Sequence, residues 1–279
     1  MISAVMAVLP VLLLSTQVDN SPRPTLDEIL QREAEYCQRL ELAALDFVCL
    51  EDITEKIDQS KDINLVKWSS PRDRPLTSVK RTFLYDFQFI RKGDSIKETR
   101  TLLKRNGRDV EVKDAELETG NFVYKNAVLA PIGIFGDKWR EAFTYKITGD
   151  ASVGGRPCLV ISAVPKGPQP EIDFLSGRAF IDKSTLDILK IEWSDQKIGN
   201  YEAFVKRGER YRMKPRISVT SEFEAEKNGI RFPTRHLIEE AYYGAAGMDS
   251  SGKFVRSRTT VLYRDFKFFT VSVERDGNN

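Results

Sequence analysis

The sequence predicts a mainly β protein of the α+β class, in which one curved or partly closed antiparallel sheet carries an N-terminal helix and a short helical plug. Three observations predict this fold class. A capped amphipathic pattern begins at Thr25, and after Leu45 apolar and polar residues largely alternate. A single apolar segment, 127–135, is broken by Pro131 and Gly133.

The first 17 residues (1–17) predict a signal peptide. Residues 2–14 are almost wholly apolar, which is too short for a bilayer span but typical of a signal-peptide core, although no Lys or Arg precedes them. The alternative is a buried N-terminal strand or helix. Residues 18–24 are interpreted as an exposed tether, and 25–279 as a single domain. We therefore expect an exported protein, periplasmic or secreted, with no transmembrane span in the mature chain.

A helix of about 20 residues is predicted to follow the tether. Thr25 and Glu28 form a capping box, in which the hydroxyl accepts from the backbone N–H of Glu28 and the carboxylate reaches back. The apolar positions then follow helical spacing, which indicates a helix that covers a sheet. They are Leu26, Ile29, Leu30, Cys37, Leu40, Ala44 and Phe47.

Period-two alternation predicts the strands. The clearest strand is 79–91, with Phe83, Tyr85, Phe87 and Phe89 on one face and a Lys-Gly-Asp hairpin turn after it. The other strand candidates are 47–57, 63–68, 95–105, 143–148, 158–164, 177–182, 188–193, 201–205, 217–226, 230–240 and 259–273, with the charged stretch 206–214 as a loop or strand edge.

The segment 122–135 interrupts the alternation. Pro131 and Gly133 disfavour a regular strand in it. A short helix that starts near Gly120 and ends or kinks before Pro131 is the better prediction, because the residue before a proline avoids helical conformation. Such a segment is suited to plug the open side of a curved sheet.

Composition excludes several kinds of site. One His excludes a two-imidazole zinc site, and three Cys exclude a four-Cys site. With 43 Lys+Arg against 41 Asp+Glu, the chain has no strong overall field for nucleic acid. Nucleophile elbows, phosphate-binding glycine loops and complete calcium loops are absent from the sequence. We expect no catalytic residue, no metal, no cofactor and no nucleic-acid partner.

Three groups of residues have both a chemical and a plainer interpretation. His236 lacks a companion motif for base catalysis, so we interpret it as a strand-surface residue. Glu51-Asp52 and Glu239-Glu240 point to opposite faces of a strand and are interpreted as solvated. The aromatic stripe of 79–91 is interpreted as a face packed on the core, with base stacking and the lining of an apolar cavity as alternatives.

Two interpretations of Cys37 and Cys49 stay open. A strand returning past the helix end would bring their Cα atoms within the ~4.4–6.8 Å that a disulfide needs. The alternative is two buried free thiols. Cys158 is interpreted as a small apolar packing residue.

The stretch 155–193 carries a resemblance to a known family. It contains the pattern G-x-x-x-I-D-x-x-T-L, and 223–237 resembles that family's late hairpin, with a proline at Pro233. Together with the signal peptide, capped helix, meander and broken apolar segment, these residues make the chain resemble the outer-membrane lipoprotein-sorting proteins. These are the LolA-like and LolB-like carriers and the related RseB-type regulator domain. The pattern residues are Gly177, Ile181, Asp182, Thr185 and Leu186.

The resemblance implies an incomplete barrel whose concave side is plugged by helices around an apolar cavity for acyl chains. The chain is longer than the usual carrier and has no Arg that aligns with the family's cavity Arg. We expect a non-enzymatic carrier or chaperone for a lipid or lipoprotein acyl chain. The alternative is an envelope regulatory or interaction module of the same fold that binds a protein partner. The implied ligand-binding residues are Phe83, Tyr85, Phe87, Phe89, Val128, Leu129, Ile132, Ile134 and Phe135.

Overall fold

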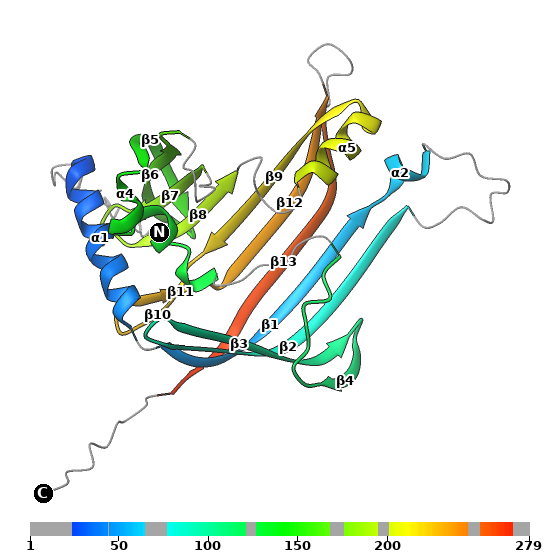
Figure 1. The fold of residues 1–279 in the computed structure, drawn as a ribbon, viewed down its shortest axis with the longest axis horizontal. Helices are drawn as coiled ribbons and strands as arrows, with labels where there is room; N and C mark the ends of the chain where they lie inside the picture. The colour runs from blue at the N-terminus through cyan, green and yellow to red at the C-terminus, as the bar shows by residue number, and fades with distance from the viewer. Residues whose placement is uncertain are drawn as a thin grey trace, which may run out of the picture.

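The computed structural model describes most of the chain and confirms the predicted fold class: a large antiparallel sheet, not closed into a barrel, with few helices (Figure 1). The predicted signal peptide, most of the predicted tether, residues 122–126 of the segment 122–135, and the ends of the predicted strands 63–68 and 259–273 lie outside the described residues. The described residues are 24–43, 45–64, 77–120, 127–167, 176–194, 201–244 and 252–269.

Helix α1 (Leu26–Leu42) begins at the predicted capping box. The backbone N–H of Thr25 donates to the Glu28 carboxylate at 2.7 Å, and the Glu28 N–H donates to the Thr25 hydroxyl at 3.3 Å. The acidic first turn also favours the positive end of the helix dipole. The buried face, which includes Ile29 and Leu40, packs toward the sheet.

Eleven strands form one sheet, in the order β4-β3-β2-β1-β13-β12-β9-β8-β7-β6-β5, and each neighbouring pair is antiparallel. A separate hairpin pairs β10 (Ala225–Lys227) with β11 (Ile230–Phe232). The sheet strands are β1 (Leu45–Asp58), β2 (Ser78–Lys92), β3 (Ser95–Arg105), β4 (Arg108–Val112), β5 (Phe143–Val153), β6 (Arg156–Pro165), β7 (Gly177–Asp182), β8 (Ile188–Ser194), β9 (Met213–Glu222), β12 (Arg235–Gly244) and β13 (Lys253–Phe268).

The first and last strands of the chain pair in the middle of the sheet. Residues of β1 face β13 from Phe47 opposite Phe268 to Ile57 opposite Ser257. Along β1, alternate side chains are buried on the inner face of the sheet, which faces the helices. This alternation is what the sequence pattern predicts for a sheet with one covered face.

The connection between β4 and β5 must cross the sheet, because these consecutive strands form its opposite edges. It contains the 3₁₀ helix η2 (Ala127–Leu129) and the short helices α3 (Ile132–Phe135) and α4 (Asp137–Arg140). The predicted helix was to end before Pro131, whereas α3 begins directly after it. Proline suits that position because a helix start leaves its N–H without a partner in any case.

Three other predictions were wrong. Residues 201–205 are not a strand but the start of helix α5 (Tyr201–Tyr211). The same helix contains the first part of the stretch 206–214, which was predicted to be a loop or strand edge. A short helix, α2 (Ser60–Asn64), stands where a strand was expected to begin at residue 63.

Helix α5 lies close against β9, since a Cβ on Gly208 would come within 2.6 Å of the Met213 carbonyl oxygen.

Candidate functional site

A small pocket lies between the inner face of the sheet and the connection that crosses it. Aromatic side chains form most of its wall, with a polar pair at one side. Its free space is about 10 Å³, which is room for about one water molecule. The lining residues are Phe47, Phe87, Phe89, Glu98, Arg100, Ala127, Val128, Pro233, Tyr263 and Phe266.

The register of the three central strands brings the aromatic wall together. Phe47 on β1 is opposite Phe89 on β2, and their rings stack with centroids 5.4 Å apart. Phe266 on β13 packs against Phe47 at 5.6 Å, while Tyr263 approaches Phe87 at 6.1 Å. Aromatic contacts at these distances add stabilisation beyond burial alone.

Arg100 on β3 gives the pocket its polar side. Its guanidinium donates to both carboxylate oxygens of Glu51, at 2.7 and 3.2 Å, and to Glu98 at 3.4 Å. The same group lies 4.5 Å from the centroid of the Phe87 ring. Bidentate pairing and the aromatic contact hold the cation in one orientation beside the apolar wall.

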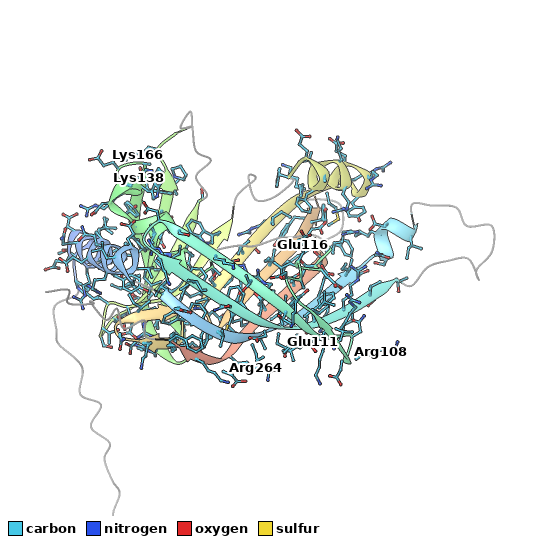
Figure 2. The ribbon with its side chains drawn as sticks, turned by 60° about the horizontal axis from the view of Figure 1, so that its bottom comes forward. Arg108, Glu111, Glu116, Lys138, Lys166 and Arg264 are labelled. Atoms are coloured by element: carbon cyan, nitrogen blue, oxygen red, sulfur yellow. The ribbon has the colours of Figure 1, made fainter. Side chains whose placement is uncertain are left out.

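The first part of the crossing connection is held by hydrogen bonds. The Tyr85 hydroxyl accepts from the Glu118 N–H at 3.2 Å and donates to the Glu116 carbonyl at 3.4 Å. The Gly120 N–H donates to the Glu55 carboxylate at 2.8 Å, and Glu55, near the end of β1, is fully buried on the inner face. In Figure 2, Glu116 lies above the sheet on the side of the helices.

The second part of the connection, 127–135, is held mainly by apolar packing and forms the plug. Val128, Ile134 and Phe135 are buried. The Tyr145 hydroxyl donates to the Ile134 carbonyl at 2.6 Å, and burial raises the pKa of that hydroxyl. A Cβ on Gly177 would come within 3.0 Å of the Ile134 side chain, so this glycine permits the close approach of α3.

The structure places the predicted ligand-binding residues in two groups. Phe87, Phe89 and Val128 line the pocket. Phe83, Tyr85, Ile134 and Phe135 are buried in the surrounding core, and Leu129 and Ile132 are partly buried against it. The sequence reasoning missed Phe47, Glu98, Arg100, Pro233, Tyr263 and Phe266.

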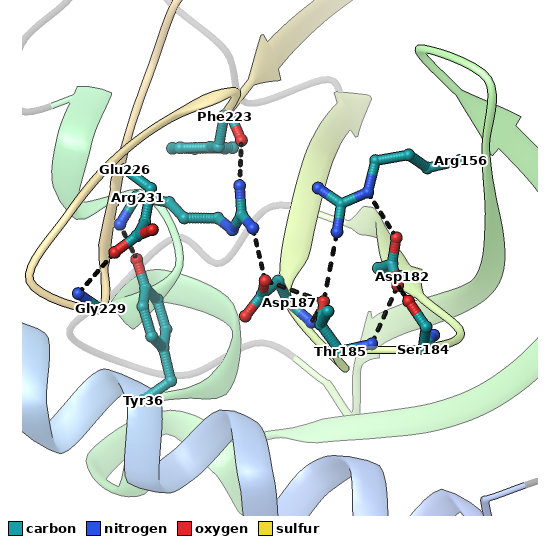
Figure 3. A network of polar contacts seen from close by, with 10 residues as sticks. All are labelled: Tyr36, Arg156, Asp182, Ser184, Thr185, Asp187, Phe223, Glu226, Gly229 and Arg231. Atoms are coloured by element: carbon teal, nitrogen blue, oxygen red, sulfur yellow. Dashed lines mark hydrogen bonds and ion pairs between the residues drawn. The ribbon is translucent and has the colours of Figure 1, made fainter.

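The pattern that carries the family resemblance builds a turn (Figure 3). The Asp182 carboxylate accepts from the Ser184 N–H, the Ser184 hydroxyl and the Thr185 N–H at 2.5–2.9 Å, and pairs with Arg156 at 2.7 Å. Burial acts to raise the pKa of Asp182, but these hydrogen bonds and the guanidinium outweigh it and lower the pKa to about 2. Leu186 closes the turn at a φ of 58°. The role of this pattern is therefore structural.

The same turn supports α1 through the β10–β11 hairpin (Figure 3). Arg231 donates to Asp187 at 2.5 Å, and its backbone N–H donates to the Tyr36 hydroxyl at 3.3 Å. Burial raises the pKa of Tyr36 to about 12. Nearby, Glu33 is 1% exposed with one carboxylate oxygen unpartnered, and burial followed by the charge of Asp187 raises its pKa well above the ordinary value.

The predicted solvation of the adjacent carboxylates was wrong for one member of each pair. Glu51 and Glu240 are fully buried on the inner face. Glu240 accepts from Ser257 at 3.1 Å and from Arg256 at 3.3 Å, and also pairs with Arg207 of α5. A buried carboxylate persists only with such partners, because desolvation of an isolated charge costs several kcal/mol.

His236 is a buried residue and not the strand-surface residue that the sequence predicted. It is 5% exposed, and its Nδ1 lies 2.8 Å from the hydroxyl of Ser221, which is 1% exposed. Burial lowers the pKa of the imidazole to about 4. A serine and a histidine this deep in the core have no approach for a substrate in this conformation.

Of the two interpretations left open for Cys37 and Cys49, the structure has the second, two buried free thiols. Both are buried, and so is Cys158. Desolvation raises the pKa of both thiols. Their charged surroundings differ, since Asp137 of α4 acts on Cys37, whereas Asp86 and Arg100 act on Cys49.

Two kinds of feature are absent from the described residues. They contain no cluster of three or more His, Cys, Asp or Glu placed to hold a metal ion. None of the helices in the described part of the chain has both the length and the apolar character that a membrane-spanning helix needs.

The fold and the pocket define a class: an open antiparallel sheet whose inner face is filled by an N-terminal helix and a helical plug. No family model matches the sequence, and no curated protein matches it. Solved structures do match, and among them are structures described as a LolA superfamily protein and an outer membrane lipoprotein-sorting domain, the family that the sequence resembles.

Three of these structures show the range of the matches. A LolA superfamily protein from Nitrosomonas europaea is 12% identical, with 87% of this chain and 94% of that chain covered and a TM-score of 0.35. A domain assigned to the outer membrane lipoprotein-sorting proteins, from Vibrio parahaemolyticus, is 13% identical over 88% and 96%, with a TM-score of 0.40. The MucA/MucB complex from Pseudomonas aeruginosa matches at 11% identity over 84% and 92%, with a TM-score of 0.24.

Proposed function

We propose that this protein is an exported, non-enzymatic carrier or chaperone that binds a lipid or lipoprotein acyl chain between the plug and the inner face of the sheet. In this proposal residues 1–17 are a signal peptide and 25–279 are one domain. The observation that carries the proposal is the aromatic-walled pocket beneath Val128, on a segment held mainly by apolar packing.

The pocket as described is small. Its space of about 10 Å³ is far below the ~300 Å³ or more of typical ligand pockets. Binding therefore requires the plug to move off the sheet. Burying a chain of roughly 14 carbons yields about 10 kcal/mol, whereas re-exposing Val128, Ile134 and Phe135 costs roughly 5–9 kcal/mol. An acyl chain can therefore replace the packing that it displaces, and Leu129 and Ile132 then join the binding surface.

The test is acyl-chain loading, measured by native mass spectrometry on protein from the cell envelope and by binding of a fluorescent fatty acid. Val128→Asp places a charge in the pocket and should weaken loading at least tenfold. Leu262→Asp is the matched control, because Leu262 is 42% exposed and does not line the pocket. The control should load within twofold of the wild-type protein.

If the wild-type protein takes up no acyl probe and carries no lipid from the envelope, the carrier proposal fails. The small volume of the pocket would then favour the second candidate, an envelope interaction module of the same fold that binds a protein partner. Equal loading by the Val128→Asp and Leu262→Asp variants would show that lipid binds elsewhere.

A further inference from the structure

The outer face of the sheet, opposite the plug and helices, carries concentrated positive charge near the end covered by α5. Its cations come from four strands, β2, β1, β13 and β9, and β12 lies between β13 and β9 in the sheet (Figure 1). We call this region the basic face. Its exposed cations are Lys56, Lys80, Lys214, Arg216, Lys253 and Arg258.

Strand register fixes these side chains on one side of the sheet. Lys80 is the partner of Lys56, and Lys56 is the partner of Arg258. Directly paired residues point to the same face. Arg264, an even number of residues from Arg258 along β13, projects away from the helices in Figure 2. The neighbour of Lys56, Glu55, is fully buried on the inner face.

The row Lys80-Lys56-Arg258 places like charges directly opposite one another, which destabilises a sheet. The carboxylate that follows in this row is Glu239, and it pairs with Lys253 at 2.5 Å and with Arg258 at 2.6 Å. Among the described residues, no ion pair joins Lys56 or Lys80 to a carboxylate. This arrangement costs stability in the free protein, and an external anion would relieve the cost.

The charge is local and has a boundary. The whole chain carries a formal net charge of only +2. On the basic face, the acidic side chains among the described residues are Glu239 and Asp58, against the six cations named above. Asp58 already accepts from the Ser60 N–H at 2.8 Å. The next row toward the middle of the sheet is uncharged: Thr82, Thr54, Thr260, Leu237 and Thr220.

The shape of the basic face favours a broad anionic partner over a small one. Its cations extend over four strand spacings, roughly 19 Å, and stand side by side on the outer face of the sheet. Among the described residues of the basic face, the aromatic side chain is that of Tyr243. The successive bases of a single-stranded nucleic acid would therefore find no row of aromatic rings to stack on. A layer of anionic headgroups meets many parallel cations at once, and each cation contributes to binding.

We propose that the basic face docks the protein on an anionic phospholipid surface. This interaction is electrostatic and independent of the pocket, so it goes beyond acyl-chain binding and stands or falls separately. It places the outer strands against the headgroups and leaves the plug on the side that faces away from them.

Vesicle co-sedimentation tests the proposal, with vesicles of phosphatidylglycerol and phosphatidylcholine compared with vesicles of phosphatidylcholine alone. The test variant combines Lys56→Gln, Lys80→Gln and Arg258→Gln. The control combines Lys92→Gln, Lys97→Gln and Lys113→Gln, three exposed cations away from the basic face, for the same change in net charge. Circular dichroism and urea midpoints show that each variant is folded.

The wild-type protein should bind the anionic vesicles and lose binding as salt rises. The test variant should bind about 100-fold more weakly, because each cation near such a surface contributes about fivefold, while the control stays within threefold. The salt series on the wild-type protein is informative without any variant. Equal binding to both kinds of vesicle, equal loss in both variants, or binding to a DNA duplex in place of vesicles would each overturn the proposal.

Discussion

Acidification is expected to remove stability through His236. Because burial lowers the pKa of this imidazole to about 4 from an ordinary 6.5, it is neutral in the folded protein where the unfolded chain would be protonated. A group with a depressed pKa contributes its full stability above the unfolded pKa and loses it as the pH falls. The free energy of unfolding should therefore decrease from about pH 6.5 down to about pH 4 on this account.

The magnitude follows from the two pKa values. Each pKa unit of difference corresponds to about 1.4 kcal/mol. Between pH 7 and pH 4.5 the loss from His236 alone should be about 2 kcal/mol. Carboxylates also titrate in this range, so the measurement needs a variant that differs only at the imidazole.

His236→Asn is that variant, because an amide does not titrate and can offer Ser221 a hydrogen-bond partner close to the position of Nδ1. Urea unfolding followed by tryptophan fluorescence gives the free energy of unfolding of both proteins at each pH. The wild-type minus variant difference should become about 2 kcal/mol less favourable from pH 7 to pH 4.5. His236 is the single histidine of the chain, so NMR also reports its pKa directly. A difference that does not change with pH, or a ring that titrates near 6.5 in the folded protein, would refute the reasoning.

Three further predictions concern other buried groups. Glu33→Gln should raise the melting temperature at pH 8 more than at pH 5. Burial raises the pKa of this carboxyl, so the wild-type protein loses stability as the pH rises above the pKa of the carboxyl in the unfolded chain. An equal rise at both pH values would contradict this. Asp182→Asn should lower the free energy of unfolding by about 2 kcal/mol at pH 7. Because the pKa of this carboxylate is lowered to about 2, urea unfolding should show the difference vanish as the pH falls from about 4 to 2. A difference that stays constant with pH would indicate a packing effect instead. Cys37 and Cys49 should resist iodoacetamide until urea unfolds the protein, as mass spectrometry would show, and labelling of the folded protein would contradict their burial.

Features with one strong local cause could be predicted from the sequence. The capping box of Thr25 and Glu28 uses residues three positions apart, so the sequence predicts the first residue of α1 correctly. The alternation from Phe83 to Phe89 reports the covered face of β2 directly. Helix α5 was missed because Tyr201, Phe204 and other strand-forming types occur in a short run, where the two periods are hard to separate.

The remaining features depend on partners that are distant in the sequence. Glu51 was expected to be solvated, and its burial depends on Arg100, which β2 and β3 bring to it. The pocket residues Phe47 and Tyr263 come together only through the pairing of β1 with β13. No local pattern in the sequence specifies that register, so neither the burial of Glu51 nor the full wall of the pocket could be read from it.

The pairing of β1 with β13 also has a consequence for the order in which the molecule can form. Strands β2–β4 on one side and strands β5–β9 and β12 on the other belong to one sheet only through that junction. A chain that leaves a ribosome or a translocation channel N-terminus first cannot complete the junction until β13 has emerged. Until then β1 and β12 each have an unpaired edge, and the aromatic wall lacks Tyr263 and Phe266. The sheet and its aromatic wall can therefore be completed only when the last strand is available.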